Sequence, residues 1–292
     1  MKDLLNITLT ADDGEVLHAY QSGTGTPMLL LHGWTASHLW WRPLIDRLAT
    51  HYRLLCPDAR GHGTRVKPLR TEPDVRRLAR DVINLLDHCG IERIAAVGHS
   101  MGALTLWQCI RDFGTNRFSH LCFIDQSPKL LTDATWQGGI YGDFDAGQAQ
   151  RLLEALRADF AEAVLRLGAL GLNDQARQSY LRDSRGWSML RESMRAVDPT
   201  ALIPIWESLV AADYRDVLAA IDRPTLLVYG TASNFYTAAT ARYVAAQIPH
   251  ARLSVYTDAD HSPHLASPQR FAGELTELLR VNQTTPTAHR DP

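Results

Sequence analysis

The sequence IAAVGHSMGA at residues 94–103 decides the fold class of this 292-residue chain. Its first four residues are small or apolar, as in a buried strand, and Gly98, Ser100 and Gly102 form a G-x-S-x-G pattern. Apolar residues then recur with helical spacing over 103–110. In a strand, a sharp turn and a helix, this pattern pushes a serine hydroxyl out at the carboxyl end of the strand. The sequence therefore predicts that Ser100 is a nucleophile and not an incidental serine of a glycine-rich turn.

Composition places the chain among globular proteins with a sizeable core. Hydrophobic residues make up 45% of the chain and the net charge is -2, so neither nucleic acid nor a membrane is an expected partner. The N-terminal residues lack the apolar segment of a signal peptide, and no apolar run is long enough to span a bilayer. Four cysteines lie among apolar neighbours without a C-x-x-C pair and are interpreted as buried free thiols (Cys56, Cys89, Cys109 and Cys122). These features predict a cytoplasmic protein.

Predicted strands and helices alternate along most of the chain. Residues 5–10 and 16–20 alternate apolar and polar side chains around a turn, which predicts an antiparallel hairpin. Continuous apolar runs predict buried strands, and segments with helical spacing separate them. The further strands are predicted at 28–31, 52–56, 94–97, 118–124, 225–229 and 253–256, and helices at 39–48, 75–89, 103–110, 240–248 and 271–279. This alternation predicts an α/β fold, with an eight-stranded, mostly parallel sheet and helices on both faces.

The alternation lapses between Lys129 and about Asp216, where the sequence is helical and rich in aromatic residues. Within this stretch, residues 152–167 form one long apolar stripe. The polar, proline-containing C-terminus is typical of a frayed tail. We predict an α/β core at 1–129 and 216–282, a helical cap at 130–215 inserted after the sixth strand, and a flexible tail at 283–292.

Polar residues follow several predicted strands, at the edge where parallel sheets bind their ligands. They are His32, Asp58, Ser100, Asp125 and His261. A serine hydroxyl needs a base within hydrogen-bond reach, and that base needs a third group to orient it. His261, in the loop after the last strand, is the preferred base, and His264 in the same loop is the alternative. His99 cannot fold back onto the neighbouring hydroxyl and is expected to pack.

In their order and spacing, these motifs resemble the α/β-hydrolase fold family over residues 7–279. The matching motifs are His32-Gly33-Trp34, Asp58-x-Arg60-Gly61-x-Gly63, Gly98-His99-Ser100-Met101-Gly102, and His261 after the eighth strand. The small serine esterases grouped with cofactor-free haloperoxidases and perhydrolases carry the same His-Gly-Trp and Ser-Met-Gly triplets. The resemblance implies an oxyanion hole formed by the backbone N–H groups of Trp34 and Met101. No cofactor or metal is expected, because Gly23-Thr24-Gly25 lacks the rest of a nucleotide-binding pattern and no metal-ligand spacing occurs in the sequence.

The acid of the catalytic triad is where this sequence departs from the family pattern. In most members it follows the seventh strand, where this chain has Ser233 and Asn234. Neither side chain carries the negative charge that stabilises an imidazolium. Some relatives take the acid from the end of the sixth strand, and the resemblance then implies Asp125. Asp258 and Asp260 stay open as alternatives.

The resemblance implies a serine hydrolase that cleaves a carboxylic ester through an acyl-enzyme. Aromatic residues in the predicted cap favour a small hydrophobic acyl or aromatic substrate; they are Trp136, Tyr141, Phe144, Phe160, Trp187 and Trp206. The same triad would serve a thioesterase, a lactonase or a C–C bond hydrolase, and lyase or cyclase chemistry or ligand binding without catalysis also stays open. A serine nucleophile disfavours haloalkane dehalogenases and epoxide hydrolases, which need a carboxylate. The sequence does not predict the oligomeric state.

Overall fold

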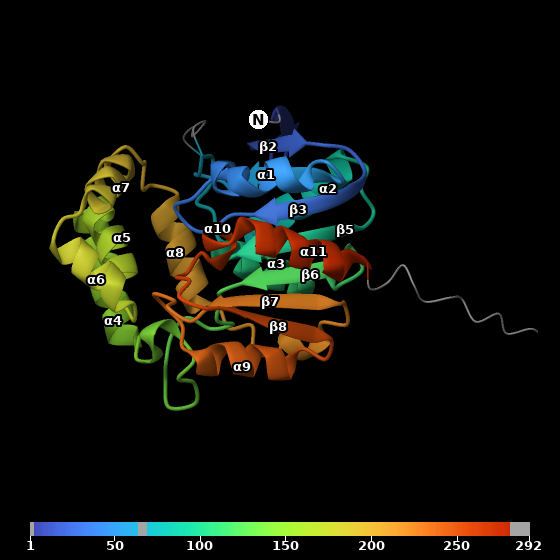
Figure 1. The fold of residues 1–292 in the computed structure, drawn as a ribbon. Helices are drawn as coiled ribbons and strands as arrows, with labels where there is room; N and C mark the ends of the chain where they lie inside the picture. The colour runs from blue at the N-terminus through green and yellow to red at the C-terminus, as the bar shows by residue number, and fades with distance from the viewer. Residues whose placement is uncertain (1–2, 64–68, 281–292) are drawn as a thin grey trace, which may run out of the picture.

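The computed structural model describes residues 3–63 and 69–280, in which eight strands form one sheet (Figure 1). The strands are β1 (Leu5–Thr10), β2 (Val16–Ser22), β3 (Thr26–Leu31), β4 (Tyr52–Asp58), β5 (Ile94–His99), β6 (Phe118–Ile124), β7 (Thr225–Gly230) and β8 (Ala251–Tyr256). Their order is β1-β2-β4-β3-β5-β6-β7-β8. The β1–β2 and β2–β4 pairs are antiparallel, and all other neighbours are parallel. The predicted α/β fold with a mostly parallel sheet is confirmed.

Helices cover both faces of this sheet (Figure 1). They are η1 (His38–Trp41), α1 (Arg42–Leu48), α2 (Val75–His88), α3 (Met101–Phe113), η2 (Ile140–Gly142), α4 (Ala146–Ala158), α5 (Phe160–Ala169), α6 (Asp174–Leu181), α7 (Arg185–Arg195), α8 (Leu202–Ala211), η3 (Leu218–Ala220), α9 (Ala238–Gln247), α10 (Pro263–Ala266) and α11 (Pro268–Arg280). Successive side chains of a strand point to opposite faces. In β3, accordingly, Met28 and Leu30 join the core shared with α1 and α11, whereas Leu29 and Leu31 join the core shared with α2, α3 and α9.

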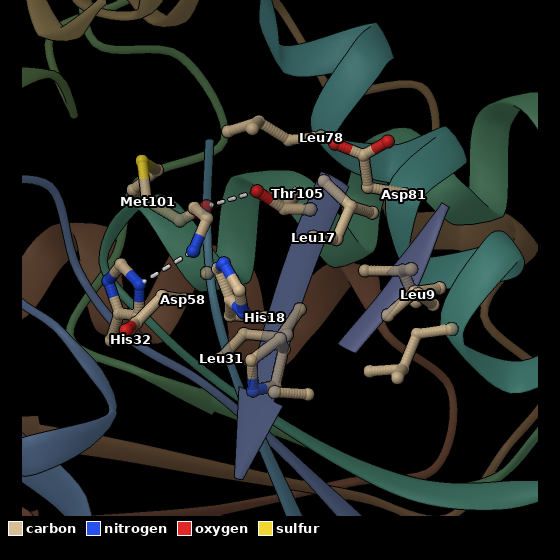
Figure 2. A pocket seen from close by; sticks show the side chains of 16 residues that line it. Leu9, Leu17, His18, Leu31, His32, Asp58, Leu78, Asp81, Met101 and Thr105 are labelled. Carbon is tan, nitrogen blue, oxygen red and sulfur yellow. Dashed lines mark hydrogen bonds between the residues drawn. The ribbon is translucent and has the colours of Figure 1, made fainter. Parts of the chain in front are cut away.

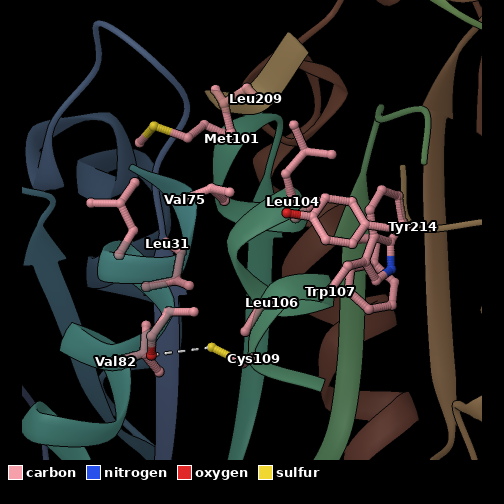
Figure 3. Packing of buried hydrophobic residues seen from close by; sticks show 14 of the residues in the cluster. Leu31, Val75, Val82, Met101, Leu104, Leu106, Trp107, Cys109, Leu209 and Tyr214 are labelled. Atoms are coloured by element: carbon pink, nitrogen blue, oxygen red, sulfur yellow. Dashed lines mark hydrogen bonds between the residues drawn. The ribbon is translucent and has the colours of Figure 1, made fainter. Parts of the chain in front are cut away.

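Helix α3, which follows Ser100, is buried along its first ten residues because it packs between the sheet and α2 (Figure 3). Trp107 of this helix lies with its ring centroid 5.1 Å from that of Phe123 and 6.2 Å from that of Tyr214. Burying a large apolar side chain typically contributes about 1.5–3 kcal/mol. The helix is therefore a rigid support for the turn that precedes it.

The cysteines lie in this packed interior. Cys56, Cys109 and Cys122 are buried, Cys89 is partly buried, and all four are free thiols. The thiol of Cys109 donates to the carbonyl oxygen of Ala79 in α2 (3.5 Å, Figure 3). Desolvation raises the pKa of each of these thiols, so they stay protonated and unreactive. Within the described residues, no helix is both long and apolar enough to cross a membrane.

Helices α4–α8, the inserted helices, lie between β6 and β7 in the chain and beyond the carboxyl ends of the parallel strands (Figure 1). The long apolar stripe expected over 152–167 is wrong: α4 ends and α5 begins at Asp159, and Ala155 is exposed. The Asp159 side chain accepts the backbone N–H of Glu162, which caps α5 and breaks the run. The cap boundaries at 130 and 215 stay a prediction, and the predicted tail lies outside the described residues.

Candidate active site

Ser100 lies on a sharp turn between β5 and α3. Its φ of 53° and ψ of -116° are unusual for a residue with a side chain. The turn is so tight that a Cβ atom on Gly98 would lie 2.5 Å from the backbone of Gly102. A Cβ atom on Gly102 would lie 2.3 Å from the carbonyl oxygen of Leu31 in β3. The strand, turn and helix expected around the G-x-S-x-G pattern are present, and the glycines are there for steric reasons.

Gly102→Ala is expected to lower the free energy of unfolding by about 1–3 kcal/mol, the usual cost of overpacking. The added methyl would meet backbone atoms of β3, which cannot move aside as a flexible side chain would. Urea denaturation measures the change. Gly273→Ala in α11 is the control, because its new methyl meets no heavy atom within 4 Å; it should stabilise by up to about 1 kcal/mol. Equal midpoints for Gly102→Ala and the unmodified protein would contradict this view of the turn.

His261 and Asp125 are brought together from the loops after β8 and β6. The Nδ1–H of His261 donates to Oδ2 of Asp125 over 2.7 Å. The Asp125 carboxylate is fully buried and also accepts the hydroxyl of Ser233 (2.6 Å) and the backbone N–H of Gly230 (3.3 Å). A buried carboxylate is stable in its ionised form only when such donors surround it. Because the carboxylate accepts at Nδ1–H, the other ring nitrogen, Nε2, is left free to accept a proton.

The alternative acids are placed differently. Asp260 is exposed, and its carboxylate accepts the backbone N–H of Ser262 (2.8 Å). Asp258 is exposed as well. Among the hydrogen bonds between described residues, neither carboxylate reaches the ring of His261. Asp125 is thus the candidate acid whose geometry suits the role.

Ser233 and Asn234 occupy the position where the family pattern places the acid. The backbone N–H of His261 donates to Oδ1 of Asn234 (3.2 Å), and Nδ2 of Asn234 donates to the carbonyl oxygen of Gly168 in α5 (2.7 Å). Asn234 therefore joins the histidine loop to the inserted helices, while Ser233 supports the carboxylate of Asp125. Sequence reasoning missed both contacts because it asked only whether these residues carry charge.

The remaining histidines near Ser100 have packing roles. His99 donates from Nε2 to the carbonyl oxygen of His261 (2.9 Å), and desolvation holds the pKa of His99 well below its usual range. His264, the alternative base, lies in α10 against Trp41 (5.0 Å between ring centroids) and His99 (4.7 Å). Desolvation lowers the pKa of His264 to about 3, and neither ring nitrogen has a hydrogen-bond partner. His261 lines the cavity described below and His264 does not.

The loop after β3 lies against the turn that holds Ser100. His32 donates from Nδ1 to the carbonyl oxygen of Gly33 (2.8 Å), and its Nε2 accepts the backbone N–H of Ala59 (3.0 Å, Figure 2). A Cβ atom on Gly33 would lie 3.3 Å from the Cβ of Ser100, so the loop approaches the serine closely. The buried His32 therefore holds this loop in place, and it does not line the cavity that contains Ser100.

Trp34 and Met101, the expected oxyanion-hole residues, both line the cavity with Ser100. Among the hydrogen bonds between described residues, none uses the backbone N–H of either residue. The carbonyl oxygen of Met101 accepts the hydroxyl of Thr105 (2.9 Å, Figure 2). Met101 also lines a second, mostly apolar cavity of about 40 Å³ (Figure 2). Neither N–H group therefore has a described partner that would compete with a ligand.

Asp58 and Arg60 hold neighbouring loops together. The carboxylate of Asp58 accepts both the backbone N–H of His38 (2.7 Å) and its ring Nδ1–H (2.9 Å). Arg60 is buried and pairs with Asp13 (2.7 Å) and Asp81 (2.5 Å). Neither Asp58 nor Arg60 lines the cavity that contains Ser100, and among the described residues neither is hydrogen-bonded to Ser100.

Ser100 and His261 line a cavity of about 840 Å³ that the inserted helices also enclose. The apolar residues that α5, α7 and α8 contribute to its wall are Val164, Leu165, Leu167, Trp187, Leu190, Met194, Leu202, Trp206 and Leu209. The Trp34 ring joins this wall, with its centroid 4.8 Å from that of Trp206. Of the six aromatic residues noted in the sequence, Trp187 and Trp206 line the cavity, and Trp136, Tyr141, Phe144 and Phe160 lie outside its lining.

Known proteins share the fold of this chain. Residues 26–268 match a family model described as the alpha/beta hydrolase fold. Over 267 residues the chain is 26% identical to a pimeloyl-[acyl-carrier protein] methyl ester esterase of Aliivibrio salmonicida. The aligned residues cover 90% of this chain and 96% of that esterase. Two solved structures superpose on 94% of this chain and 100% of their own. They are an esterase from Exiguobacterium antarcticum (TM-score 0.81, 20% identity) and a bromoperoxidase from Bacillus anthracis (TM-score 0.80, 18% identity), and at these identities they show the fold alone.

Proposed function

This chain is an enzyme of the α/β-hydrolase fold family, and on that premise we propose that it is a serine hydrolase that cleaves carboxylic esters through an acyl-enzyme. One observation carries the proposal: Ser100, on its strained turn, lines the same cavity as His261, whose ring is hydrogen-bonded to the buried Asp125. A hydroxyl is a competent nucleophile only when an oriented base takes its proton. The similarity to a curated esterase over nearly the whole chain supports this choice.

In the first half of the proposed reaction, Oγ of Ser100 attacks the carbonyl carbon of the ester. Nε2 of His261 takes the hydroxyl proton, and Asp125 keeps hold of Nδ1–H and stabilises the imidazolium by its negative charge. The backbone N–H groups of Trp34 and Met101 donate to the oxyanion that forms; loss of one such donor typically costs about 2.7–4 kcal/mol. The intermediate then collapses, and His261 gives its proton to the departing alcohol.

In the second half, a water molecule replaces the alcohol. His261 takes a proton from this water as its oxygen attacks the acyl carbon, and the same oxyanion donors act again. The proton then returns to Oγ of Ser100 as the carboxylic acid leaves. The apolar wall supplied by the inserted helices, here proposed to act as a cap, suits a hydrophobic acyl or aromatic group.

Hydrolysis of p-nitrophenyl esters from acetyl to decanoyl tests the proposal, together with labelling by a fluorophosphonate. The expected result is turnover with an optimum above acetyl, because longer chains bury more apolar area in the cavity. Mass spectrometry should locate the label on Ser100. Labelling without ester turnover would support Ser100 as the nucleophile and indicate that the protein cleaves an acyl bond other than that of an ester. Absence of both would contradict the proposal.

Asn234→Ala is expected to lower kcat about tenfold, because it removes the acceptor that holds the backbone of His261 and frees the loop from α5. Asn173→Ala is the matched control. Asn173, at the start of α6, donates to the carbonyl oxygen of Ala232 (2.7 Å). It therefore also joins the loop after β7 to the inserted helices, but it makes no hydrogen bond to the histidine loop. Both variants should unfold at lower temperature, and only Asn234→Ala should lose kcat. Equal kcat losses in the two variants would refute a specific role for Asn234.

A further inference from the structure

One buried polar side chain of the cavity has no task in the reaction described above. Gln126 follows Asp125 directly, is 2% exposed and lines the cavity. We propose that Gln126 determines specificity: its side-chain amide donates to a neutral acceptor oxygen that the substrate carries in addition to its ester group. This inference rests on the proposed function, because the molecule bound is the ester that Ser100 attacks.

The protein holds the Gln126 amide in one orientation. Oε1 accepts the backbone N–H of Ser127 (2.7 Å) and the hydroxyl of Tyr236. A backbone N–H can only donate, so its partner is the amide oxygen and not the amide nitrogen. The carbonyl oxygen of Gln126 accepts the hydroxyl of Tyr229, which holds the main chain as well. With its oxygen held in this way, the amide directs Nε2 away from the Ser127 N–H and the Tyr236 hydroxyl.

Within the part of the chain that the structure describes, the Nε2 group keeps both of its protons unpaired. It donates to none of the described residues, and it is not among the fully buried side-chain nitrogens that lack a partner. The small accessible surface of Gln126 therefore includes this nitrogen. Other residues that line the same cavity are apolar, such as Leu130 and Phe235. An amide nitrogen without an acceptor in such surroundings is unfavourable, and a substrate oxygen would supply the missing acceptor.

The charge of the wall indicates the kind of oxygen. No lysine or arginine is among the described residues that line the cavity, whereas Asp198 and Asp260 are. Among these described lining residues, a carboxylate would find no cation and two like charges, while an ether, ketone or second ester oxygen needs only the neutral amide. A site built to bind a polar group rejects an analogue that lacks it far more strongly than an apolar pocket rejects a missing methylene. The preferred substrate class is thus a hydrophobic ester with a second, neutral oxygen.

Two ester series test this assignment. The first contains p-nitrophenyl hexanoate and its analogues with an ether oxygen in place of the methylene at C3, C4 or C5. The second contains hexyl acetate and the corresponding alkoxyalkyl acetates. Each kcat/KM is divided by the rate of hydroxide-catalysed hydrolysis of the same ester, which removes differences in intrinsic reactivity. The unmodified protein is expected to prefer one oxygen position at least tenfold over the all-carbon ester. A preference below twofold at every position in both series would overturn the inference, and this measurement needs no variant.

Gln126→Met keeps the length of the side chain and removes the donor. Its preference for the oxygen-containing ester is expected to fall below twofold, while hexanoate is still hydrolysed and Ser100 is still labelled by the fluorophosphonate. Tyr236→Phe is the control, because it removes one donor to Oε1 and leaves Nε2 in place; it should retain the preference. A preference that persists in Gln126→Met would overturn the inference. If the unmodified protein neither hydrolyses p-nitrophenyl hexanoate nor is labelled by the fluorophosphonate, the proposed function itself is contradicted.

Discussion

Ser100→Ala is expected to lower kcat for p-nitrophenyl ester hydrolysis by about 10⁴- to 10⁶-fold, the range seen when a triad nucleophile is removed. The variant keeps the base and the oxyanion donors, but it has no oxygen to form the acyl-enzyme. Its residual rate would come from water attacking a bound, polarised ester. KM should change little if substrate binding depends on the apolar wall and not on the hydroxyl.

Two measurements separate this loss from a loss of folding. The hydroxyl of Ser100 makes no hydrogen bond to a described residue, so the thermal unfolding midpoint of the variant should match that of the unmodified protein. Fluorophosphonate labelling should disappear in the variant. Ser193→Ala is the matched control, since Ser193 lines the same cavity from α7, and its kcat should stay within about threefold. A Ser100→Ala variant that keeps a tenth of the activity would exclude Ser100 as the nucleophile.

The fold and the sharp turn that carries Ser100 were predictable from sequence because local sterics leave a clear pattern in it. Glycine at 98 and 102 is required by backbone atoms a few ångströms away, and the apolar runs on either side mark the strand and the helix. The break between α4 and α5 was missed because it depends on whether one side chain, Asp159, turns to cap a helix. An apolar stripe shows which residues prefer burial, but it does not show where the chain bends.

The supporting contacts of the site were less accessible to sequence reasoning. Asp125 and His261 lie 136 residues apart, and only the position of each at a strand end, together with the family resemblance, suggested that they meet. Ser233, Asn234 and Gln126 act through the direction of single hydrogen bonds. That direction depends on side-chain rotamers, which no spacing pattern records.

Asp125→Asn is expected to lower kcat by about 10³- to 10⁴-fold, with little change in KM. Asparagine fills the same space, but the backbone N–H of Gly230 can only donate and would keep the amide oxygen at the Oδ1 position. The amide nitrogen would take the Oδ2 position, which faces both Ser233 and His261. The amide nitrogen would then face His261 and donate to Nδ1, which places the ring proton on Nε2, where Ser100 needs an acceptor. The negative charge that stabilises the imidazolium would be lost as well. The p-nitrophenol burst of the first turnover measures the acylation step directly.

Two further variants, Ser233→Ala and Asp260→Asn, separate the effect of losing the Asp125 charge from the effects of changing neighbouring groups. Ser233→Ala removes one donor to the carboxylate and leaves its charge, so kcat should fall by no more than about 100-fold, in line with the net worth of about 1.5–3 kcal/mol for a hydrogen bond to a charged group. Asp260→Asn alters an exposed carboxylate that contacts only its own loop, and it should change kcat less than twofold. A severe loss in Asp260→Asn with near-normal turnover in Asp125→Asn would transfer the acid role to Asp260. Because the buried carboxylate of Asp125, and not that of Asp260, is hydrogen-bonded to the His261 ring, we expect the opposite ranking.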